Sequence, residues 1–444
     1  MPRIALRLHH HIHSHVRGID LSTILSRDDA AWRASKVVSR ICLLKDSFSV
    51  DRLWHENDQD RSSEKLCLRA WISAKIVCAE QSRIQSIRKV DTRSIRKDVL
   101  LCLGMLLRQN DILARAHPRV LNNEHESAPV DAEGMMQLVN ARYKTRVRVS
   151  NESYVEAVST NGKIFRGHAK GAKGKTTHIH FRQGISTSHA IQSVRVIGLN
   201  EPTASERARD SLLLRVLQDE AKLTDAEFVR FIWFRTKEDT QRLQQPSASL
   251  GINDSLLEPH LKHLNASQVR VVAAMVDVNP VVVVHGPPGT GKTTTISSAA
   301  EIWSKVYYDP VWIIGHSNVS VKNIAEKLLK RKVDFKLIVS KEFYVEWHEH
   351  IYEKIQERLM RTDELPADRL AMSQVVGSSR VILSTLGLLS NPALDKNGTF
   401  DIIPVERLIV DEASQINVFE YMHVLHKFRK SLQKLCFFGD PKQC

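Results

Sequence analysis

The feature that most constrains this chain is the run Gly286-Pro287-Pro288-Gly289-Thr290-Gly291-Lys292-Thr293, which follows four consecutive valines at 281–284 and precedes a segment able to form a helix. Glycines let successive backbone N–H groups curl around an anion, and the helix that follows directs its positive N-terminus at the same point. A glycine-rich turn that binds nothing is the alternative, but eight matching positions behind a valine strand disfavour it. The pattern therefore predicts a strand–loop–helix unit that holds the phosphates of a nucleoside triphosphate.

Individual roles within this loop follow from the chemistry of its side chains. We expect Lys292 to reach the β- and γ-phosphates and Thr293 to offer its hydroxyl to a magnesium ion. ATP and Mg²⁺ are thus the expected cofactors. The residues expected to contact the nucleotide are Gly286, Pro287, Pro288, Gly289, Thr290, Gly291, Lys292, Thr293 and Thr294.

A second acidic element points to hydrolysis of the nucleotide. The apolar run 407–410 ends in Asp411-Glu412-Ala413-Ser414-Gln415. An aspartate at the carboxyl end of a buried parallel strand is where a second magnesium contact belongs, and Glu412 is then placed to polarise an attacking water as general base. Asp-Glu alone is a common surface dipeptide, so its meaning depends on the strand before it and on the phosphate loop upstream.

Composition limits the remaining possibilities. A length of 444 residues allows two or three domains, and no apolar stretch approaches the roughly 18 residues that cross a bilayer. The six cysteines are scattered without a C-x-x-C pair, which suits a reducing compartment and gives no zinc framework. We expect a cytoplasmic protein, with the nucleus as the alternative and no membrane as partner.

The first 134 residues carry less functional information. Residues 1–30 are basic and rich in histidine, and we expect them to be disordered. A mitochondrial presequence and capture of a metal by the histidines are the alternatives for this segment. Residues 31–134 show helical periodicity, so a mainly helical region is expected. Its sequence does not indicate a role.

A basic segment with β-strand patterning comes next, and we expect a small β-barrel over residues 135–200. Between 141 and 200 there are eleven lysines and arginines against two glutamates, a net charge of +9. Basic side chains alternate with other types at 143–149, and Asn161-Gly162 is a strong hairpin signal. A basic face suits a nucleic-acid backbone, whereas an idle basic surface is the alternative. The residues expected to contact the nucleic-acid backbone are Arg146, Arg148, Lys173 and Lys175.

The chain then changes to an α/β pattern. Residues 201–235 are expected to form a stalk helix, opened by the capping box from Thr203 to Glu206, followed by an apolar strand or core segment at 228–234. Residues 236–262 are expected to be a linker. From 263 to 444, strands alternate with helices, which predicts a parallel sheet with helices on both faces and a helical insertion near 343–374. The expected strands are 281–284, 311–314, 336–339, 380–383, 407–410 and 434–438.

The order of these motifs resembles that of superfamily 1 helicases, and most closely that of the up-frameshift and senataxin group. The resemblance covers about residues 264–443 and implies a RecA-like P-loop NTPase lobe. The group also has a β-barrel and stalk helices before this lobe, so the basic segment fits its layout. The matching motifs are Leu264-Asn265-Ala266-Ser267-Gln268, the phosphate loop, His316-Ser317-Asn318-Val319-Ser320-Val321, Ser384-Thr385, Asp411-Glu412-Ala413-Ser414-Gln415 and Gly439-Asp440-Pro441-Lys442-Gln443.

The resemblance also implies roles for single residues. Gln268 would read the adenine with its amide, which can both donate and accept. Gln415 and Gln443 would sense the γ-phosphate, Gln443 as part of the catalytic set with Lys292 and Glu412. Short polar groups would face the sugar–phosphate backbone of a nucleic acid, namely those of Ser317, Asn318, Ser384 and Thr385. A lone Gln268 or Asn318 is more often a turn or capping residue, but the order and spacing of the set around two strong motifs favour the functional roles.

The function implied by the resemblance is an ATP-dependent helicase or translocase that moves 5′ to 3′ on single-stranded RNA or DNA. Factors of RNA decay or transcription termination are the expected protein partners. Members of the family need a second RecA-like lobe with arginines that reach the γ-phosphate, and we expect this chain to lack it. A remnant that binds ATP and nucleic acid without turnover is therefore the alternative. An unrelated P-loop ATPase such as a transporter subunit is disfavoured, because no ABC-type signature is present.

Overall fold

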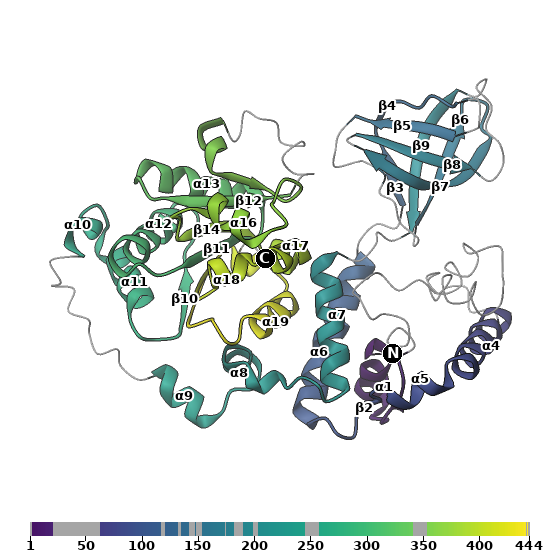
Figure 1. Cartoon of the computed structure of the whole chain (residues 1–444), viewed down its shortest axis with the longest axis horizontal. Coiled ribbons are helices and arrows are strands. Elements are labelled where there is room, and N and C mark those ends of the chain that lie inside the picture. Colours follow the sequence, from purple (N-terminus) through teal and green to yellow (C-terminus); the bar gives the residue numbers. More distant parts are fainter. Residues whose placement is uncertain are drawn as a thin grey trace. The chain divides into compact units, whose positions relative to one another are not determined.

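The computed structural model describes residues 2–20, 63–116, 120–131, 135–141, 147, 153–173, 175–181, 190–198, 203–244, 257–340, 353–440 and 442 of the 444-residue chain (Figure 1). The chain forms two compact units. The first comprises Met1–Pro202 with Leu213–Glu220, and the second comprises Thr203–Leu212 with Ala221–Cys444. Each unit contains its own large sheet and its own apolar core.

Helices form the N-terminal part of the first unit: α1 (Pro2–Ile12), α4 (Ser63–Ala79), α5 (Gln81–Ser86) and α6 (Lys97–Ala116), with β1 (Arg17–Gly18) paired antiparallel to β2 (Val90–Asp91). Helix α1 packs against α6, with Ala5, Leu6 and His9 buried and an ion pair of 2.9 Å between Arg7 and Asp111. The predicted disorder of residues 1–30 is therefore wrong for α1, because this segment has an apolar face that α6 can cover.

The described residues contain no metal-binding cluster and no helix that could cross a membrane. No group of three or more histidine, cysteine, aspartate or glutamate side chains in this part of the chain is arranged to hold a metal ion. Within the same residues, every helix is too short or too polar to cross a membrane.

A seven-stranded antiparallel sheet completes the first unit. Its strands are β3 (Val120–Asn123), β4 (His125–Ser127), β5 (Met135–Asn140), β6 (Ser153–Ser159), β7 (Ile164–Lys173), β8 (Thr176–Phe181) and β9 (Ile191–Gly198), in the order β3-β9-β6-β7-β8-β5-β4. The sheet curls around a core that includes Phe165, Ile179 and Val194 (Figure 1). The hairpin predicted at Asn161-Gly162 joins β6 to β7, and Gly162 has a φ of +78°. The sheet begins earlier than predicted, because β3 and β4 precede residue 135.

Helices connect this sheet to the second unit. Helix α7 (Ala204–Leu217) begins at the predicted capping box, in which Thr203 N donates to Glu206 Oε2 at 2.8 Å and Glu206 N donates to Thr203 Oγ1 at 3.2 Å. The 3₁₀ turn η3 (Leu223–Asp225), α8 (Glu227–Trp233), α9 (Lys237–Gln244) and α10 (Glu258–Leu261) follow. Of the two alternatives for 228–234, a strand is wrong because α8 occupies the segment, and a core segment is right because Phe228, Val229 and Phe231 are buried. The predicted linker 236–262 contains α9 and α10.

The second unit is built on a parallel sheet of seven strands. They are β10 (Val281–His285), β11 (Val311–Gly315), β12 (Phe335–Val339), β13 (Leu359–Arg361), β14 (Val381–Thr385), β15 (Arg407–Asp411) and β16 (Lys434–Gly439), in the order β10-β16-β15-β11-β14-β12-β13. All six predicted strands are present. The predicted insertion 343–374 is not helical throughout: its described part holds the 3₁₀ helix η5 (Glu353–Arg358), the edge strand β13 and the start of α16 (Arg369–Val376).

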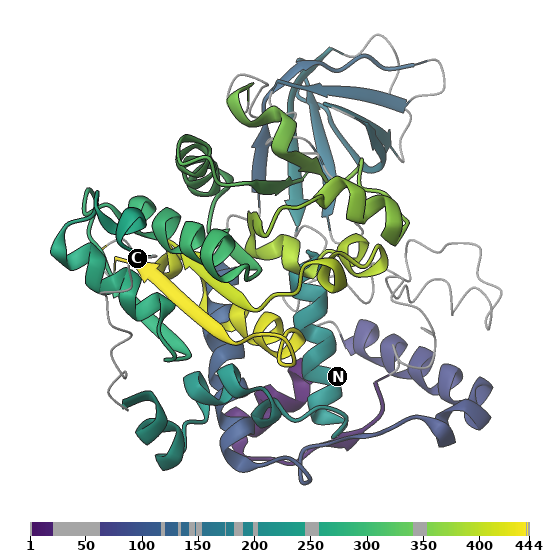
Figure 2. The same cartoon turned by 60° about the vertical axis from the view of Figure 1, so that its left-hand side comes forward.

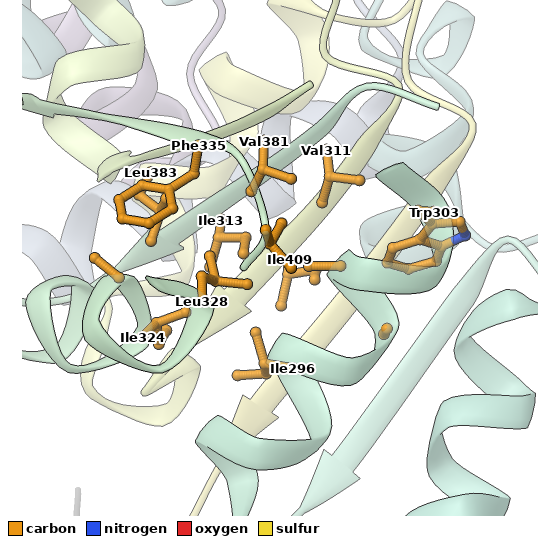
Figure 3. Close-up of a cluster of buried hydrophobic side chains, with 14 of the residues drawn as sticks. Ile296, Trp303, Val311, Ile313, Ile324, Leu328, Phe335, Val381, Leu383 and Ile409 are labelled. Atoms are coloured by element: carbon orange, nitrogen blue, oxygen red, sulfur yellow. The ribbon is translucent and has the colours of Figure 1, made fainter. Parts of the chain in front are cut away.

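Helices cover both faces of this sheet, as predicted (Figures 1 and 2). On one face lie α11 (Ala266–Val276), α12 (Lys292–Ile302), which continues as η4 (Trp303–Tyr307), and α13 (Asn318–Lys330). Figure 3 shows Ile296 of α12 and Leu328 of α13 against Ile313 and Ile409 of the sheet. On the other face, Trp312 stacks on Phe400 of α18. The elements there are η6 (Leu386–Ser390), α17 (Pro392–Lys396), α18 (Thr399–Ile402), η7 (Ala413–Gln415) and α19 (Val418–Lys427).

Candidate active site

The register of the parallel strands brings the predicted motifs to one edge of the sheet. Gly315 at the end of β11 is level with Asp411 of β15 on one side and with Thr385 of β14 on the other. Likewise, His285 at the end of β10 is level with Gly439 of β16. The carboxyl ends of the strands are where open α/β sheets bind ligands. The loops after these strands therefore form one continuous candidate site.

The phosphate loop has the backbone that an anion cradle needs. Gly289 and Gly291 have φ values of +79° and +87°, in the left-handed region that favours glycine. Gly291 also caps the N-terminus of α12, so the first free N–H groups of that helix border the loop. The N–H of Gly286 donates to the carbonyl of Gly439 at 3.0 Å, which fixes the start of the loop on the neighbouring strand.

The ammonium of Lys292 lies at the mouth of this cradle. It donates to the carbonyl oxygen of Gly286 and lies 3.4 Å from that of Pro287. The approach requires glycine at position 286, since a Cβ there would stand 2.8 Å from Lys292 Cγ. The side chain is therefore folded over the loop, where a phosphate group would be bound.

Gln268 connects the first motif of the lobe to the phosphate loop. Its side-chain Oε1 accepts from the backbone N–H of Asn265, and Asn265 Oδ1 accepts from the backbone N–H of Gln268, which makes a capping box at α11. The amide of Gln268 donates to Thr290 O at 3.0 Å. Both ends of the side chain thus have protein partners at the border of the loop, and adenine recognition by Gln268 stays a proposal.

Asp411 is a buried carboxylate, and one of its two oxygens has no hydrogen-bond partner among the described groups. The residue is 6% exposed, its Oδ2 accepts from Ser320 Oγ at 3.1 Å, and its Oδ1 has no hydrogen-bond partner among the described groups. Burial raises the pKa of this carboxyl, against the lowering effects of the Ser320 hydrogen bond, the Glu412 backbone N–H and the Lys292 charge. Mg²⁺ prefers carboxylate and hydroxyl oxygens, and Thr293 at the start of α12 is half-buried. The unpartnered oxygen of Asp411 therefore fits a magnesium site, and Thr293 as the second ligand stays a prediction.

Glu412 adopts a backbone conformation that is uncommon for its residue type. Its φ and ψ are 54° and 36°, a left-handed geometry, and it begins the 3₁₀ turn η7. Such a conformation costs roughly 1–3 kcal/mol and is concentrated at functional sites. Burial and the adjacent Asp411 charge both raise the pKa of the Glu412 carboxyl, which suits a general base.

The remaining members of the nucleotide set are placed as follows. Gln415 is exposed at the end of η7, and its N–H donates to the carbonyl of Glu412 at 3.0 Å. The neighbouring Ser414 approaches Gly439 so closely that a Cβ on Gly439 would meet Ser414 N at 3.0 Å. Gln443 lies outside the described residues. A contact that the motifs did not signal is that of His285 Nε2 with Asp440 Oδ1, 3.6 Å apart.

The residues expected to face a nucleic acid divide into two groups. Ser317 caps α13 by accepting from the N–H of Ser320 at 3.2 Å, and Asn318 is the first residue of that helix. Thr385 is half-buried, with no side-chain hydrogen bond at its capping position. Ser384, however, is fully buried, so the expectation that its hydroxyl faces a backbone is wrong for this structure. Both faces of β14 are covered, so its residues from Val381 to Ser384 are all buried, and Thr385 at the end of the strand is half-buried.

The basic residues of the first unit are only partly described. Arg146, Arg148 and the side chain of Lys173 lie outside the described residues. Lys175 Nζ is 3.7 Å from Glu126 Oε1 and 3.4 Å from the carbonyl of Ala141, so part of its charge is balanced within the sheet. The alternation predicted at 143–149 lies outside the described residues, apart from residue 147. Strand β7 does alternate: Phe165 and Ala169 are buried in the core, and the residues that follow them, Arg166 and Lys170, are exposed.

Comparison with known proteins agrees with this geometry. Residues 268–444 match a protein family described as an AAA domain. An uncharacterised ATP-dependent helicase of Methanocaldococcus jannaschii is 38% identical over 85 residues, 19% of this chain and 13% of that protein. A regulator of nonsense transcripts 1 homolog of Arabidopsis thaliana is 40% identical over 70 residues, 16% of this chain and 6% of that protein. The lobe is similar to those of up-frameshift-type superfamily 1 helicases.

The resemblance stated from the motifs is thus confirmed, over part of the chain. A DNA replication ATP-dependent helicase/nuclease of Mus musculus is 31% identical over 157 residues, 35% of this chain and 14% of that protein. The matched regions span 6% to 14% of these three relatives. A solved helicase structure, that of PRRSV nsp10, covers 76% of this chain at 12% identity with a TM-score of 0.20, a likeness too slight to carry a conclusion.

Proposed function

We propose that this chain binds Mg·ATP and serves an ATP-dependent helicase or translocase that acts on single-stranded nucleic acid. The observation that carries the proposal is the meeting at one sheet edge of the loop with Lys292, the unpartnered Oδ1 of Asp411, and Glu412 in its left-handed conformation. Helicase names among the similar proteins support the same reading.

Each residue has a definite task in this proposal. Backbone N–H groups of the loop and Lys292 bind the phosphates, and Asp411 and Thr293 hold Mg²⁺, which neutralises charge on the phosphate oxygens. Glu412 orients the attacking water and accepts its proton. Gln268 reads the adenine, while Gln415 and Gln443 sense the γ-phosphate. Turnover in this class also needs arginines worth roughly 10³–10⁵ in rate. We propose that a second lobe supplies them.

The nucleic acid would run along the same edge of the sheet. The first turn of α13, with Ser317 and Asn318, and the capping position Thr385 offer N–H and hydroxyl groups to phosphates. The basic segment adds Lys and Arg charges. The similar proteins carry names from RNA and from DNA processes alike, so both nucleic acids are candidate substrates. Movement 5′ to 3′ and partners from RNA decay or transcription termination belong to this proposal.

The test is coupling between the two ligands. Fluorescence anisotropy of labelled single-stranded RNA and DNA oligonucleotides is measured with and without a non-hydrolysable ATP analogue and Mg²⁺. A helicase lobe should change its oligonucleotide affinity by roughly 5-fold or more when the analogue binds. The Lys292→Ala variant should lose this response, and Lys430→Ala, at an exposed site after α19, should retain it. If the unaltered chain has the same oligonucleotide affinity with and without the ATP analogue, the proposal is contradicted.

A further inference from the structure

A continuous chain of hydrogen bonds runs from the first turn of α13 to the metal-site carboxylate. Ser317 Oγ accepts from the backbone N–H of Ser320 at 3.2 Å, and Ser320 Oγ donates to Asp411 Oδ2 at 3.1 Å. Ser320 is 6% exposed and Asp411 is also 6% exposed, so water does not compete strongly for this second bond. The bond joins residues 91 positions apart in the chain.

The backbone is shaped to allow this contact. Gly315 ends β11 beside Asp411 of β15, directly under the first turn of α13. A Cβ on Gly315 would stand 2.7 Å from Ser320 Oγ and 2.8 Å from Val321 Cγ2. Separations below 3.0 Å are essentially never found for real Cβ atoms, so a larger residue at 315 would force the Ser320 hydroxyl and the Val321 methyl group to shift. Glycine at 315 thus permits Ser320 to reach Asp411, independently of the hydrogen bond itself.

We propose that Ser320 is a positioning residue for Asp411, and that through it the first turn of α13 and the metal-site carboxylate move as one unit. The inference rests on the proposed function of the lobe and adds a specific link between its two ligand sites. Ser320 does not itself contact nucleotide or nucleic acid in this scheme.

The consequence for the carboxylate is geometric. A hydroxyl that donates to Oδ2 fixes the carboxylate plane and leaves the unpartnered Oδ1 as the oxygen that could take a Mg²⁺ ion. Hydrogen bonds of this supporting kind orient metal ligands, and their loss commonly weakens metal affinity roughly 10–100-fold. Without the Ser320 hydroxyl, Asp411 Oδ2 would also lose its side-chain donor.

The consequence for regulation follows from the Ser317 end of this series of hydrogen bonds. Ser317 and Asn318 lie at the N-terminus of α13, which we propose faces the nucleic-acid backbone. A nucleic-acid strand that displaces the first turn of α13 would displace Ser320 as well, because the N–H of Ser320 donates to the hydroxyl of Ser317. Occupancy of the nucleic-acid site would therefore change the affinity of the Asp411 site for Mg²⁺, and the reverse must hold by linkage.

The test uses the full chain and reads nucleotide binding rather than turnover. A fluorescent ATP analogue is titrated at fixed protein while Mg²⁺ is varied, with and without a single-stranded RNA oligonucleotide. We expect Ser320→Ala to raise the Mg²⁺ concentration at half-saturation by roughly 10-fold, and RNA to shift that midpoint in the unaltered chain but not in the variant. Binding of the analogue in EDTA should be equal in the two, since the phosphate loop is intact.

Two variants separate positioning from simple damage. Ser304→Ala is the matched control, because the Ser304 hydroxyl donates only to carbonyls of its own helix, Ala300 O at 2.7 Å and Glu301 O at 3.2 Å. It should leave the Mg²⁺ midpoint unchanged. Gly315→Ala keeps the Ser320 hydroxyl but displaces it, and it should raise the midpoint as Ser320→Ala does.

The outcomes also distinguish this inference from the proposed function. If the unaltered chain shows Mg²⁺-dependent binding that Lys292→Ala abolishes, the nucleotide site stands. An unchanged Mg²⁺ midpoint in Ser320→Ala, under those conditions, overturns the positioning role alone. Equal shifts in Ser320→Ala and Ser304→Ala would likewise overturn it, because the effect would then reflect general loss of packing.

Discussion

The side-chain amide of Gln268 donates to the carbonyl oxygen of Thr290 at 3.0 Å, while its other end closes the N-terminus of α11. One glutamine therefore holds a helix terminus and the phosphate loop together. Gly291 makes room for it, since a Cβ at that position would lie 2.4 Å from Gln268 Nε2. The loop geometry and the first motif of the lobe depend on each other.

We predict that Gln268→Ala loses both stability and ATP affinity. Loss of the capping box should lower the free energy of unfolding by about 1 kcal/mol. Loss of the Thr290 contact should also weaken Mg·ATP binding several-fold, because the loop is less constrained. Asn265→Ala is the control: it removes the cap at similar cost but leaves the Thr290 carbonyl with its donor. Urea unfolding and calorimetric titration measure the two effects, and equal loss of ATP affinity in both variants would contradict the role of Gln268.

We predict that Glu412→Gly and Glu412→Gln differ in stability. Glycine relieves the left-handed strain, whose cost is roughly 1–2 kcal/mol for other residues, so Glu412→Gly should unfold at higher urea than Glu412→Gln. Both should bind Mg·ATP like the unaltered chain, because neither alters the loop or Asp411. A Glu412→Gly variant that is the less stable of the two would show that the φ of 54° carries no strain.

Much of this lobe could be predicted because its signals are local. Four valines before the phosphate loop, and an apolar run ending at Asp411, identify buried strands whose ends carry the chemistry. The short apolar run 228–234 indicated a strand or a core segment, and it forms the buried helix α8, because a run this short does not distinguish strand from helix. Strand β13 has three residues and lies at the edge of the sheet, too short to produce a pattern.

Contacts that depend on tertiary structure left no trace in the sequence. Ser320 looks like any serine in the first turn of a helix, and its bond to Asp411 exists only because β11 and β15 are adjacent. Burial of Ser384 follows from the helices that cover both faces of β14, and the sequence of this strand does not show how far that cover extends. The helix α1 was predicted as a disordered tail because its partner α6 lies about 90 residues further along the chain.

We predict an acid-sensitive step in stability from His423. This residue of α19 is 4% exposed and its Nε2 lies 2.7 Å from Ser390 Oγ and 3.3 Å from Ser205 Oγ. Burial, with smaller effects of Arg209 and Lys427, lowers the pKa of His423 from 6.5 to about 4. The folded state therefore binds fewer protons than the unfolded state below pH 6.5, so stability falls as the pH drops from 6.5 towards 4.

For a pKa shift of this size in His423, the loss in free energy of unfolding is at most roughly 3 kcal/mol. It should be reduced in His423→Gln, which can still accept a serine hydroxyl but does not titrate. Urea unfolding of both proteins between pH 7 and pH 5 isolates the histidine, because most carboxylates stay ionised there. Identical pH profiles for the two proteins would show that His423 does not titrate on unfolding in this range.

We predict a salt-dependent contact between the basic segment and single strands. Contact with about four phosphates gives a log–log slope near −3, from roughly −0.7 per phosphate. Replacing Arg146, Arg148, Lys173 and Lys175 with glutamine should flatten that slope uniformly across sequences and spare ATP binding. Part of the Lys175 charge is already balanced by Glu126, so this residue should contribute least. An unchanged slope in the fluorescence-anisotropy titration would place the nucleic acid elsewhere on the chain.

The account depends most directly on the phosphate loop, and one calorimetric titration tests it. Mg·ATP is titrated into the unaltered chain, into Lys292→Ala, and into Lys430→Ala as a control that removes an equal charge from an exposed site. We predict saturable binding to the unaltered chain and to Lys430→Ala, with most of the affinity lost in Lys292→Ala because the ammonium at the mouth of the loop is gone. Equal Mg·ATP affinity in all three proteins would contradict the assignment of the site.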